Sequence, residues 1–198
     1  MIAIIDYKAG NLTSVKLAFD ALGAESRITS DPAAIVAAER VVFPGVGAAA
    51  SAMRNLRELG LEETVRQCAA QKPFLGICLG MQILFDHTEE DGGVDTLGII
   101  SGQVRRFRDL PGFKVLEIGW NQVDFTDGEN LGGSPMRAEY YFVHSYYAEI
   151  CPWTAGTTEY AGVNFTAMVK KDRLWACQFH PEKSGRTGLA LLDDWLKS

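Results

Sequence analysis

The first half of the chain alternates short apolar runs with segments in which apolar residues recur at helical spacing. Apolar runs typical of strands lie at Ile2 to Asp6, Glu25 to Thr29, Arg40 to Phe43 and Pro73 to Ile77. Helical spacing covers residues 11–22, with a stop expected at Gly23, and residues 79–85. Asp31-Pro32 is typical of a helix start. This alternation predicts βα units around a parallel sheet.

The second half of the chain contains many strand-like runs with no long helix between them. Strands are predicted at Val104 to Phe107, Val115 to Ile118, Tyr140 to Val143, Gly162 to Val169 and Leu174 to Phe179. A closing helix is predicted at Gly188 to Leu196, where leucines recur at helical spacing. Residues 1–198 are therefore expected to form one α/β domain whose parallel sheet continues into mixed or antiparallel strands.

Composition and charge narrow the class of protein. The 198 residues are 47% hydrophobic and carry a formal net charge of -6, which fits one globular domain. No basic run is longer than residues 104–108, so no nucleic-acid partner is expected. The N-terminal apolar run meets Asp6 without a charged region before it, and no apolar stretch approaches the roughly 20 residues that span a bilayer. We expect no signal peptide, no membrane segment and a cytoplasmic location.

The four cysteines form no recognisable metal-binding pattern. Cys68, Cys78, Cys151 and Cys177 lack the close paired spacing of a zinc site, and a disulfide framework is not expected in a cytoplasmic chain of this size. Each is expected to be a free thiol. A free cysteine usually behaves as a small buried hydrophobe, and this is our interpretation of Cys68, Cys151 and Cys177.

The surroundings of Cys78 favour a nucleophile instead. Gly76-Ile77-Cys78-Leu79-Gly80 joins a predicted strand to a predicted helix in the G-x-nucleophile-x-G form of a nucleophile elbow. Side chains two residues before and after so sharp a turn would collide, so glycine is favoured there. The following helix places N–H groups and partial positive charge beside the sulfur, which favours the thiolate. The Leu79 N–H is then a natural donor to an oxyanion.

His180 and Glu182 are candidates for the base and its orienting partner. Pro181 disfavours helix at His180, so this segment is expected to be extended, and alternate residues of an extended segment share a face. That arrangement suits one group that accepts the thiol proton and a second that orients the imidazole. His87 lies in a polar stretch and is interpreted as a surface residue in a loop. His144 ends a strand and is expected to contact a substrate rather than transfer a proton.

A loop with two glycines follows the third predicted strand. Pro44-Gly45-Val46-Gly47 allows backbone N–H groups to approach a ligand closely. By itself such a loop is more often a plain turn, and it lacks the lysine and Ser/Thr of a phosphate loop. Beside the Cys78 elbow it becomes a candidate second wall of the site. Because Gly45 and Gly47 make two peptide orientations accessible, we hypothesise that the loop must flip a peptide to present its donors.

Together these segments resemble the class I (triad) glutamine amidotransferases, whose α/β fold is flavodoxin-like. Within that family the chain resembles the glutaminase subunits of imidazole glycerol phosphate synthase, nearly from end to end. Residues 76–82 and 178–184 carry the motifs of the superfamily. Residues 4–12, 118–121 and 141–147 select this member over the anthranilate, carbamoyl phosphate, purine and pyridoxal phosphate branches.

The resemblance implies a reaction and a set of binding residues. Cys78 would attack the side-chain amide of glutamine, release ammonia and leave a glutamyl thioester that water cleaves to glutamate. No metal or organic cofactor is implied. The family pattern assigns glutamine binding to Gly45, Gly47, Gln82, His144, Ser145 and Tyr146. It assigns stabilisation of the oxyanion to the backbone N–H groups of Val46 and Leu79.

The resemblance also implies a partner. In this family ammonia passes to a separate (β/α)8-barrel cyclase, which makes imidazole glycerol phosphate and an aminoimidazole carboxamide ribotide for histidine synthesis. Once the glutaminase fold is counted, no residues remain for an acceptor-substrate domain, so a heterodimer is expected. The residues expected at or near the partner are Asn11, Trp120, Asn121, Tyr141 and Lys183.

Two segments depart from the family pattern and leave alternatives open. Lys8-Ala9 replaces a glycine-containing lead-in to Gly10-Asn11, and Leu116-Glu117 stands where the family usually has Pro-His. Both fall near the expected partner surface, so they bear on docking and on which synthase the subunit serves. The alternatives are an amidotransferase subunit for another synthase, such as a sugar-modifying one, a partner-independent γ-glutamyl cysteine hydrolase, and a binding protein that kept the fold without activity.

Overall fold

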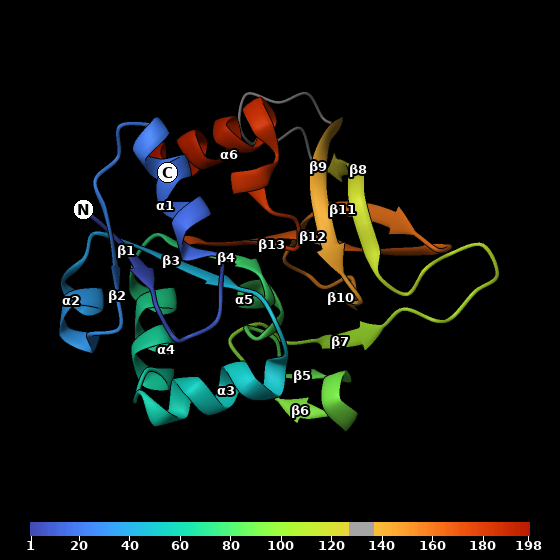
Figure 1. Cartoon of the computed structure of the whole chain (residues 1–198), viewed down its shortest axis with the longest axis horizontal. Helices are drawn as coiled ribbons and strands as arrows, with labels where there is room; N and C mark the ends of the chain where they lie inside the picture. Colours follow the sequence, from blue (N-terminus) through green and yellow to red (C-terminus); the bar gives the residue numbers. More distant parts are fainter. Residues whose placement is uncertain (127–136) are drawn as a thin grey trace.

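The computed structural model describes residues 1–126 and 137–198 and is built around a mixed sheet (Figure 1). The parallel part of the sheet has the strand order β2-β1-β3-β4-β13. These strands are Ser26–Thr29, Ile2–Ile5, Arg40–Gly45, Phe74–Cys78 and Leu174–Cys177. The order 2-1-3-4 is that of a flavodoxin-like sheet, in which sites form beyond the carboxyl ends of the strands. The predicted α/β class and the parallel first half are confirmed.

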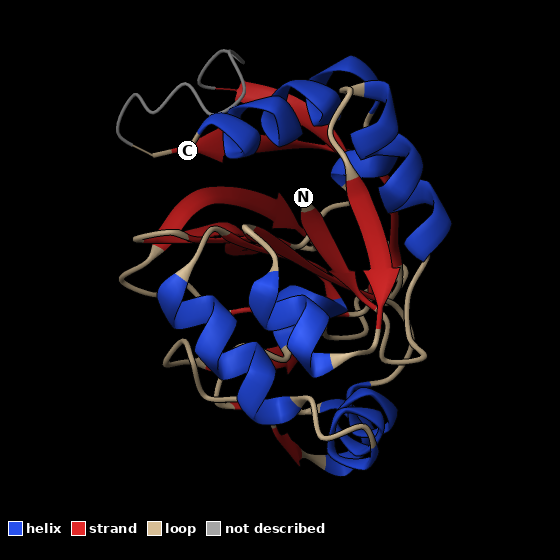
Figure 2. Ribbon diagram, turned by 90° about the vertical axis from the view of Figure 1, so that its left-hand side faces the viewer, coloured by secondary structure: helices blue, strands red, loops and turns tan. Residues whose placement is uncertain are grey.

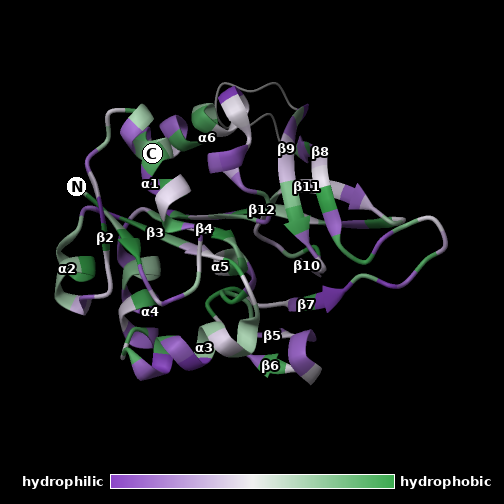
Figure 3. Ribbon diagram, in the orientation of Figure 1, coloured by the Kyte–Doolittle hydropathy of each residue, from purple (hydrophilic) through white to green (hydrophobic). Residues whose placement is uncertain are grey.

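Helices cover both faces of the parallel strands (Figure 2). One face carries α1 (Leu12–Ala21) and α6 (Gly185–Lys197), and the other carries α2 (Pro32–Ala37), α3 (Ala49–Glu58) and α4 (Glu62–Gln71). Ile2 and Ile4 of β1 pack on the α1 side, and Ala3 and Ile5 on the α3 side. Because both of their faces are buried, β1, β3, β4 and β13 are largely apolar runs, and hydrophobic residues concentrate along them (Figure 3), whereas the edge strand β2 is only partly buried.

Local sequence explains how the first two helices begin. The Asn11 side chain accepts a backbone N–H at the start of α1, and Gly23 follows its end with a φ of 70°. The Asp31 carboxylate accepts the Ala33 N–H at 3.0 Å, and proline occupies the first position of α2. These starts and stops are confirmed. The helices α3 and α4 are additions to the prediction.

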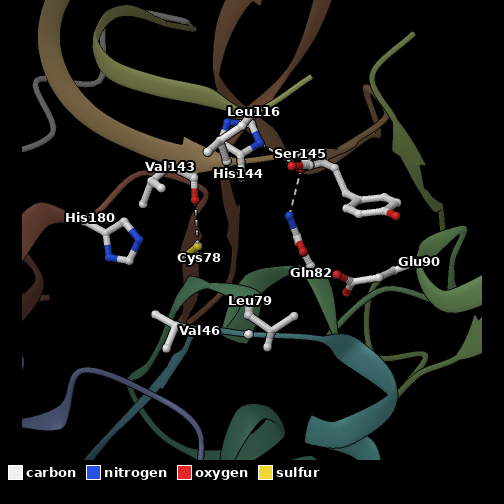
Figure 4. A pocket seen from close by; sticks show the side chains of 12 residues that line it. Val46, Cys78, Leu79, Gln82, Glu90, Leu116, Val143, His144, Ser145 and His180 are labelled. Atoms are coloured by element: carbon white, nitrogen blue, oxygen red, sulfur yellow. Dashed lines mark hydrogen bonds between the residues drawn. The ribbon is translucent and has the colours of Figure 1, made fainter. Parts of the chain in front are cut away.

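Mostly antiparallel strands extend the sheet beyond β13, in agreement with the predicted mixed or antiparallel extension. The path runs through β12 (Val163–Lys171), β10 (Tyr146–Ala148) and β7 (Gln103–Arg106) to β5 (His87–Thr88) and β6 (Val94–Asp95). A branch leaves β12 through β11 (Thr154–Tyr160), β8 (Glu117–Phe125) and β9 (Arg137–His144). This branch stands beside the carboxyl end of β4 and forms one wall of the site (Figures 1 and 4).

Three sequence expectations are corrected in this half. The strand expected at Val115 to Ile118 begins at Glu117 and continues to Phe125, because it pairs with β9 along its length. His87 lies in the short strand β5 rather than in a loop, because β5 pairs with β6 at Asp95 and with β7 at Gln103. The strands β6, β10 and β11 were not anticipated. Their alternation of apolar and polar residues is short or weak, and strand pairing rather than local propensity defines them.

No helix in the described ranges is long and apolar enough to cross a membrane.

Candidate active site

Cys78 occupies the turn at which β4 passes directly into α5 (Leu79–Gln82). Its backbone has φ 54° and ψ -113°, a conformation that non-glycine residues rarely adopt outside functional turns. A side chain at Gly80 would collide with the Phe43 carbonyl, and one at Gly76 would lie 3.1 Å from the Gly80 carbonyl oxygen. The strand, cysteine and helix arrangement expected of an elbow is therefore present, with glycine where the backbone requires it.

The helix after Cys78 is shorter than expected. It ends at Gln82, whereas the sequence pattern predicts helix through residue 85, because Ile83 adopts φ -78° and ψ 0° and the chain turns there. A helix of one turn has a small dipole, since few peptide units align. The main positive partner of the sulfur must therefore come from elsewhere in the fold.

That partner is His180, which follows β13 and is almost fully buried. Its Nδ1 atom lies 2.8 Å from Oε1 of Glu182, whose side chain is also buried. His180 is extended, as expected, but Pro181–Lys183 forms a 3-10 turn rather than the predicted extended segment. The turn places Glu182 beside the ring by folding the chain back on itself. The expected pairing is present, although by a different backbone geometry.

Electrostatics favour the protonated form of the His180 ring. Burial alone would lower the pKa of His180, but its interactions with Cys78 and Glu182 offset this effect and raise the pKa to about 10. Nε2 makes no hydrogen bond of ordinary length among the described residues, and it faces the Cys78 sulfur across the site (Figure 4). The ring is thus placed to take the thiol proton and later deliver it to a leaving group.

A cavity of about 330 Å³ opens in front of Cys78 (Figure 4). It collects most of the residues proposed from the sequence, although they come from four separate segments of the chain. Its lining residues are Val46, Gly47, Cys78, Leu79, Gln82, Glu90, Leu116, Val143, His144, Ser145, Tyr146 and His180. Gly45 lies just behind this wall, because it pairs with Cys78 across β3 and β4. A side chain at Gly45 would collide with the Tyr7 hydroxyl.

A chain of side-chain amides links Gln82 to the nucleophile. Gln82 donates through Nε2 to the Tyr146 carbonyl at 2.8 Å and to Oε1 of Gln178 at 2.9 Å. Gln178 in turn donates through Nε2 to the Cys78 sulfur at 3.7 Å. An N–H donor to sulfur stabilises negative charge there. Gln178 was not among the predicted site residues. It precedes His180 by two positions, so the alternation that groups His180 with Glu182 was a usable signal.

Glu90 is a second residue that the sequence did not indicate. It belongs to the short 3-10 helix η1 (Glu90–Gly92), lines the cavity opposite Cys78, and accepts the Ala49 N–H through Oε2 at 2.7 Å. Burial raises the pKa of the Glu90 carboxyl. A carboxyl in this place suits a ligand ammonium group. Glu90 has no local feature that would single it out, since it stands in a polar run of acidic residues.

The two remaining histidines have separate environments. The His144 ring lines the cavity, as a residue expected to contact a substrate should, and is itself buried between Glu117 and the Tyr146 carbonyl. His87 is remote from this lining and contacts the exposed Asp95 through Nδ1 at 2.8 Å. No group of three or more His, Cys, Asp or Glu side chains within residues 1–126 and 137–198 is arranged to hold a metal ion.

The expected partner residues are partly grouped. Trp120 is 56% exposed, and its ring meets that of Tyr141 edge to face at 6.4 Å. The ammonium group of Lys183 lies over the Tyr141 ring, 5.9 Å from its centroid. Asn11 caps α1, and the Asn121 amide is engaged inside the chain. Trp120, Tyr141 and Lys183 therefore form one surface group beside the site, while the two asparagines also have structural contacts.

Comparisons with known proteins agree with this geometry. The model of the class-I glutamine amidotransferase family matches residues 3–197. An imidazole glycerol phosphate synthase subunit HisH of Herpetosiphon aurantiacus is 47% identical over 100% of this chain and 94% of that protein. Proteins of the same name from Dehalococcoides mccartyi and Acinetobacter baylyi are 47% and 44% identical, over 100% and 99% of this chain and 97% of each relative.

Solved structures share the fold. A crystal structure of a glutamine amidotransferase has a TM-score of 0.77 at 19% identity, over 100% of this chain and 98% of that chain. PurLQS from Thermotoga maritima has a TM-score of 0.74 at 16% identity, over 99% of this chain and 97% of that chain. At such low identity the likeness concerns the fold alone. The family match and the full-length relatives go further, and with the geometry of Cys78 they show that the chain belongs to the class I glutamine amidotransferases and, among them, to the HisH subunits of imidazole glycerol phosphate synthase.

Proposed function

We propose that this chain, acting as one unit over residues 1–198, hydrolyses glutamine to glutamate and ammonia as the glutaminase subunit of an imidazole glycerol phosphate synthase. The observation that carries the proposal is the arrangement of Cys78 and His180 on the wall of one cavity, with Glu182 paired to Nδ1 of His180. A buried imidazole whose pKa is raised to about 10 matches a thiolate partner, which is the reactive form of cysteine. A binding protein without activity has no use for this arrangement.

The reaction follows from the placement of these groups. The Cys78 thiolate attacks the side-chain carbonyl carbon of glutamine, and the carbonyl π electrons move to oxygen. N–H groups of Val46 and Leu79 stabilise that oxyanion. As the oxyanion collapses, His180 gives its proton to the departing nitrogen, so that ammonia leaves and a thioester remains. His180 then removes a proton from water, which attacks the thioester, and glutamate departs as the Cys78 thiolate is restored.

The other cavity residues hold the amino-acid end of glutamine. The Glu90 carboxyl can pair with the α-ammonium group, and the segment His144 to Tyr146 supplies polar groups to the α-carboxylate. Gln82 lies between these groups and Cys78, and Gly47 leaves room for the substrate in the cavity, while Gly45 lies behind the wall. The Gly47 φ of 97° supports a loop with more than one accessible peptide orientation, so we keep the hypothesis that the oxyanion donors form by a peptide flip.

Ammonia would pass to a separate (β/α)8-barrel cyclase that forms a heterodimer with this chain. The cyclase uses it to make imidazole glycerol phosphate and an aminoimidazole carboxamide ribotide. The exposed apolar residues Ile118 and Trp120 support a partner on the β8 face, where a groove of about 310 Å³ also lies. A nucleophile that works as a free thiol also fits a reducing compartment, and we place the reaction in the cytoplasm.

Glutamate release from glutamine tests this function. The purified chain is assayed alone and with the cyclase subunit of the same organism plus its nucleotide substrate. We expect little release by the chain alone and a large increase with partner and nucleotide together. Equal release in both samples would point to an independent γ-glutamyl hydrolase. Stimulation by a different synthase instead would reassign the partner.

A further inference from the structure

A buried carboxylate stands directly behind the cavity wall. Glu117, the first residue of β8, is 3% exposed and faces His144 across the β8–β9 pair. Its Oε2 atom lies 2.9 Å from Nε2 of His144, and its Oε1 accepts from Nδ2 of Asn121 at 2.8 Å. A glutamate is rarely this buried without a function in packing or positioning, because removal of its charge from water costs free energy that only close partners offset.

The His144 ring is held from both sides. Nδ1 lies 2.7 Å from the Tyr146 carbonyl, and since a carbonyl oxygen only accepts, Nδ1 carries the hydrogen. On the other side, Nε2 lies 2.9 Å from Oε2 of Glu117, and this contact is an ion pair when Nε2 also carries a hydrogen. One ring thus connects strand β8 to the turn between β9 and β10. The segment of the cavity wall from His144 to Tyr146 depends on this connection for its position.

Glu117 itself does not line the cavity that contains Cys78. It lines the neighbouring groove with Trp120 and Asn121, while His144 lines the cavity. The Tyr146 carbonyl that receives the His144 N–H also receives Nε2 of Gln82. Displacement of the ring would therefore move a carbonyl that fixes Gln82. Glu117 can influence a ligand through His144 and Tyr146 without touching it.

We propose that Glu117 is a positioning residue for the amino-acid end of the substrate, acting by clamping His144 and thereby fixing the segment His144 to Tyr146. The proposal rests on the glutamine hydrolysis proposed above. Asn121 supports the clamp, since its Nδ2 atom donates to the carboxylate and also to the Glu159 carbonyl at 3.0 Å.

Covalent labelling of Cys78 in the full-length chain tests the clamp. A chloroketone analogue of glutamine alkylates the thiol after its amino-acid end binds, whereas iodoacetamide needs no such binding. In Glu117→Gln the side chain keeps its shape but loses its charge. We expect the chloroketone concentration for half-maximal labelling to rise about tenfold, because a buried partner is lost. The maximal labelling rate and the iodoacetamide rate should stay within about twofold of the wild type.

Matched variants separate positioning from a general structural effect. Glu139→Gln removes the same charge from an exposed position on β9 and should leave all three quantities unchanged. Glu117→Asp keeps the charge but withdraws it from His144, so it should weaken chloroketone binding in the same direction even if Glu117→Gln folds poorly. In a His144→Asn background the Glu117→Gln change should have less than about a twofold effect, because the clamp is already gone.

The outcomes distinguish the two proposals. Equal chloroketone binding by the wild type, Glu117→Gln and Glu117→Asp would overturn the clamp and leave the glutaminase function intact. An undiminished Glu117→Gln effect in the His144→Asn background would also overturn it, because Glu117 would then act by another route. A wild-type chain that reacts with iodoacetamide but never with the glutamine analogue, even with the cyclase subunit and its nucleotide present, would overturn the proposed function, and the clamp with it.

Discussion

Nδ1 of His180 and Oε1 of Glu182 lie 2.8 Å apart on a 3-10 turn that buries both side chains. Ser184 fixes this turn, since its hydroxyl donates to the His180 carbonyl at 2.6 Å and accepts the Tyr141 N–H at 3.0 Å. Packing and hydrogen bonds within the chain therefore orient the base. Such preorganisation places the imidazole without further rearrangement when a substrate reaches Cys78.

The charge on His180 should make stability depend on pH. The pKa of the ring is about 10 in the folded chain and about 6.5 in the unfolded chain, so the folded state keeps the proton up to a higher pH than the unfolded state does. The stabilising contribution is complete below about pH 6.5 and is lost as the pH rises toward 10. As the pH rises from about 6.5 to about 10, we expect the urea midpoint of the wild type to decrease more than that of His180→Gln. Parallel curves for the two proteins would contradict the assignment.

Replacement of the nucleophile should abolish turnover. Cys78→Ala is expected to lower glutamate release on the order of 10⁴-fold, because the covalent route is lost. Association with the partner should remain. Cys177→Ala is the matched control, since Cys177 is a buried thiol on the neighbouring strand whose pKa is raised by desolvation. It should retain activity within a few-fold, as measured by the same assay. Retained turnover in Cys78→Ala would remove the cysteine from the mechanism.

The N–H···S contact from Gln178 should support the thiolate. Gln178→Leu removes the donor at 3.7 Å from the sulfur and also releases Gln82. We expect kcat for glutamate release to fall about tenfold, and iodoacetamide to react more slowly at pH 7, because the charged sulfur loses a donor. The exposed Gln71→Leu on α4 is the control and should match the wild type. An unchanged iodoacetamide rate in Gln178→Leu would limit this residue to packing.

The oxyanion loop should be sensitive to a side chain at Gly47. This glycine has a φ of 97°, which alanine rarely adopts, although no atom lies within 4 Å of the added Cβ. Gly47→Ala is expected to lower kcat on the order of tenfold with a smaller change in KM, because the donors act on the oxyanion. Gly23→Ala is the matched control. Gly23 has a φ of 70° and also has no atom within 4 Å of an added Cβ, so alanine imposes similar strain there, but at the end of α1 and far along the chain from Cys78. An equal loss of kcat in both variants would point to general destabilisation.

The surface group around Trp120 should contribute to partner binding. Trp120 is 56% exposed on β8, and large exposed aromatic side chains often dominate interfaces. Trp120→Ala should weaken association with the cyclase by about tenfold or more, measured by titration calorimetry, while iodoacetamide labelling of Cys78 stays unchanged. Trp153→Ala, at a site 40% exposed, is the control. Equal losses of affinity in both variants would remove Trp120 from the interface.

Short-range sequence signals were enough to predict the sharp turn at Cys78 and the parallel sheet. Gly76 and Gly80 flank Cys78 because a backbone this tight excludes side chains, and that constraint is readable from a few adjacent residues. The apolar runs of β1, β3 and β4 are equally local, since strands buried on both faces need no polar alternation. The pairing of His180 with Glu182 was also readable from spacing, although the turn that achieves it was not.

Other features required the tertiary structure. Glu90 and Glu117 carry no local signature, because each has its role from a partner dozens of residues away along the chain. The length of α5 and the pairing of β11 with β8 and β12 likewise depend on neighbours that only the folded chain supplies. The sequence by itself determined which residues can do the chemistry, since backbone sterics and side-chain type act locally. Only the tertiary structure decided what surrounds them, because burial and electrostatic contact join segments that are distant in sequence.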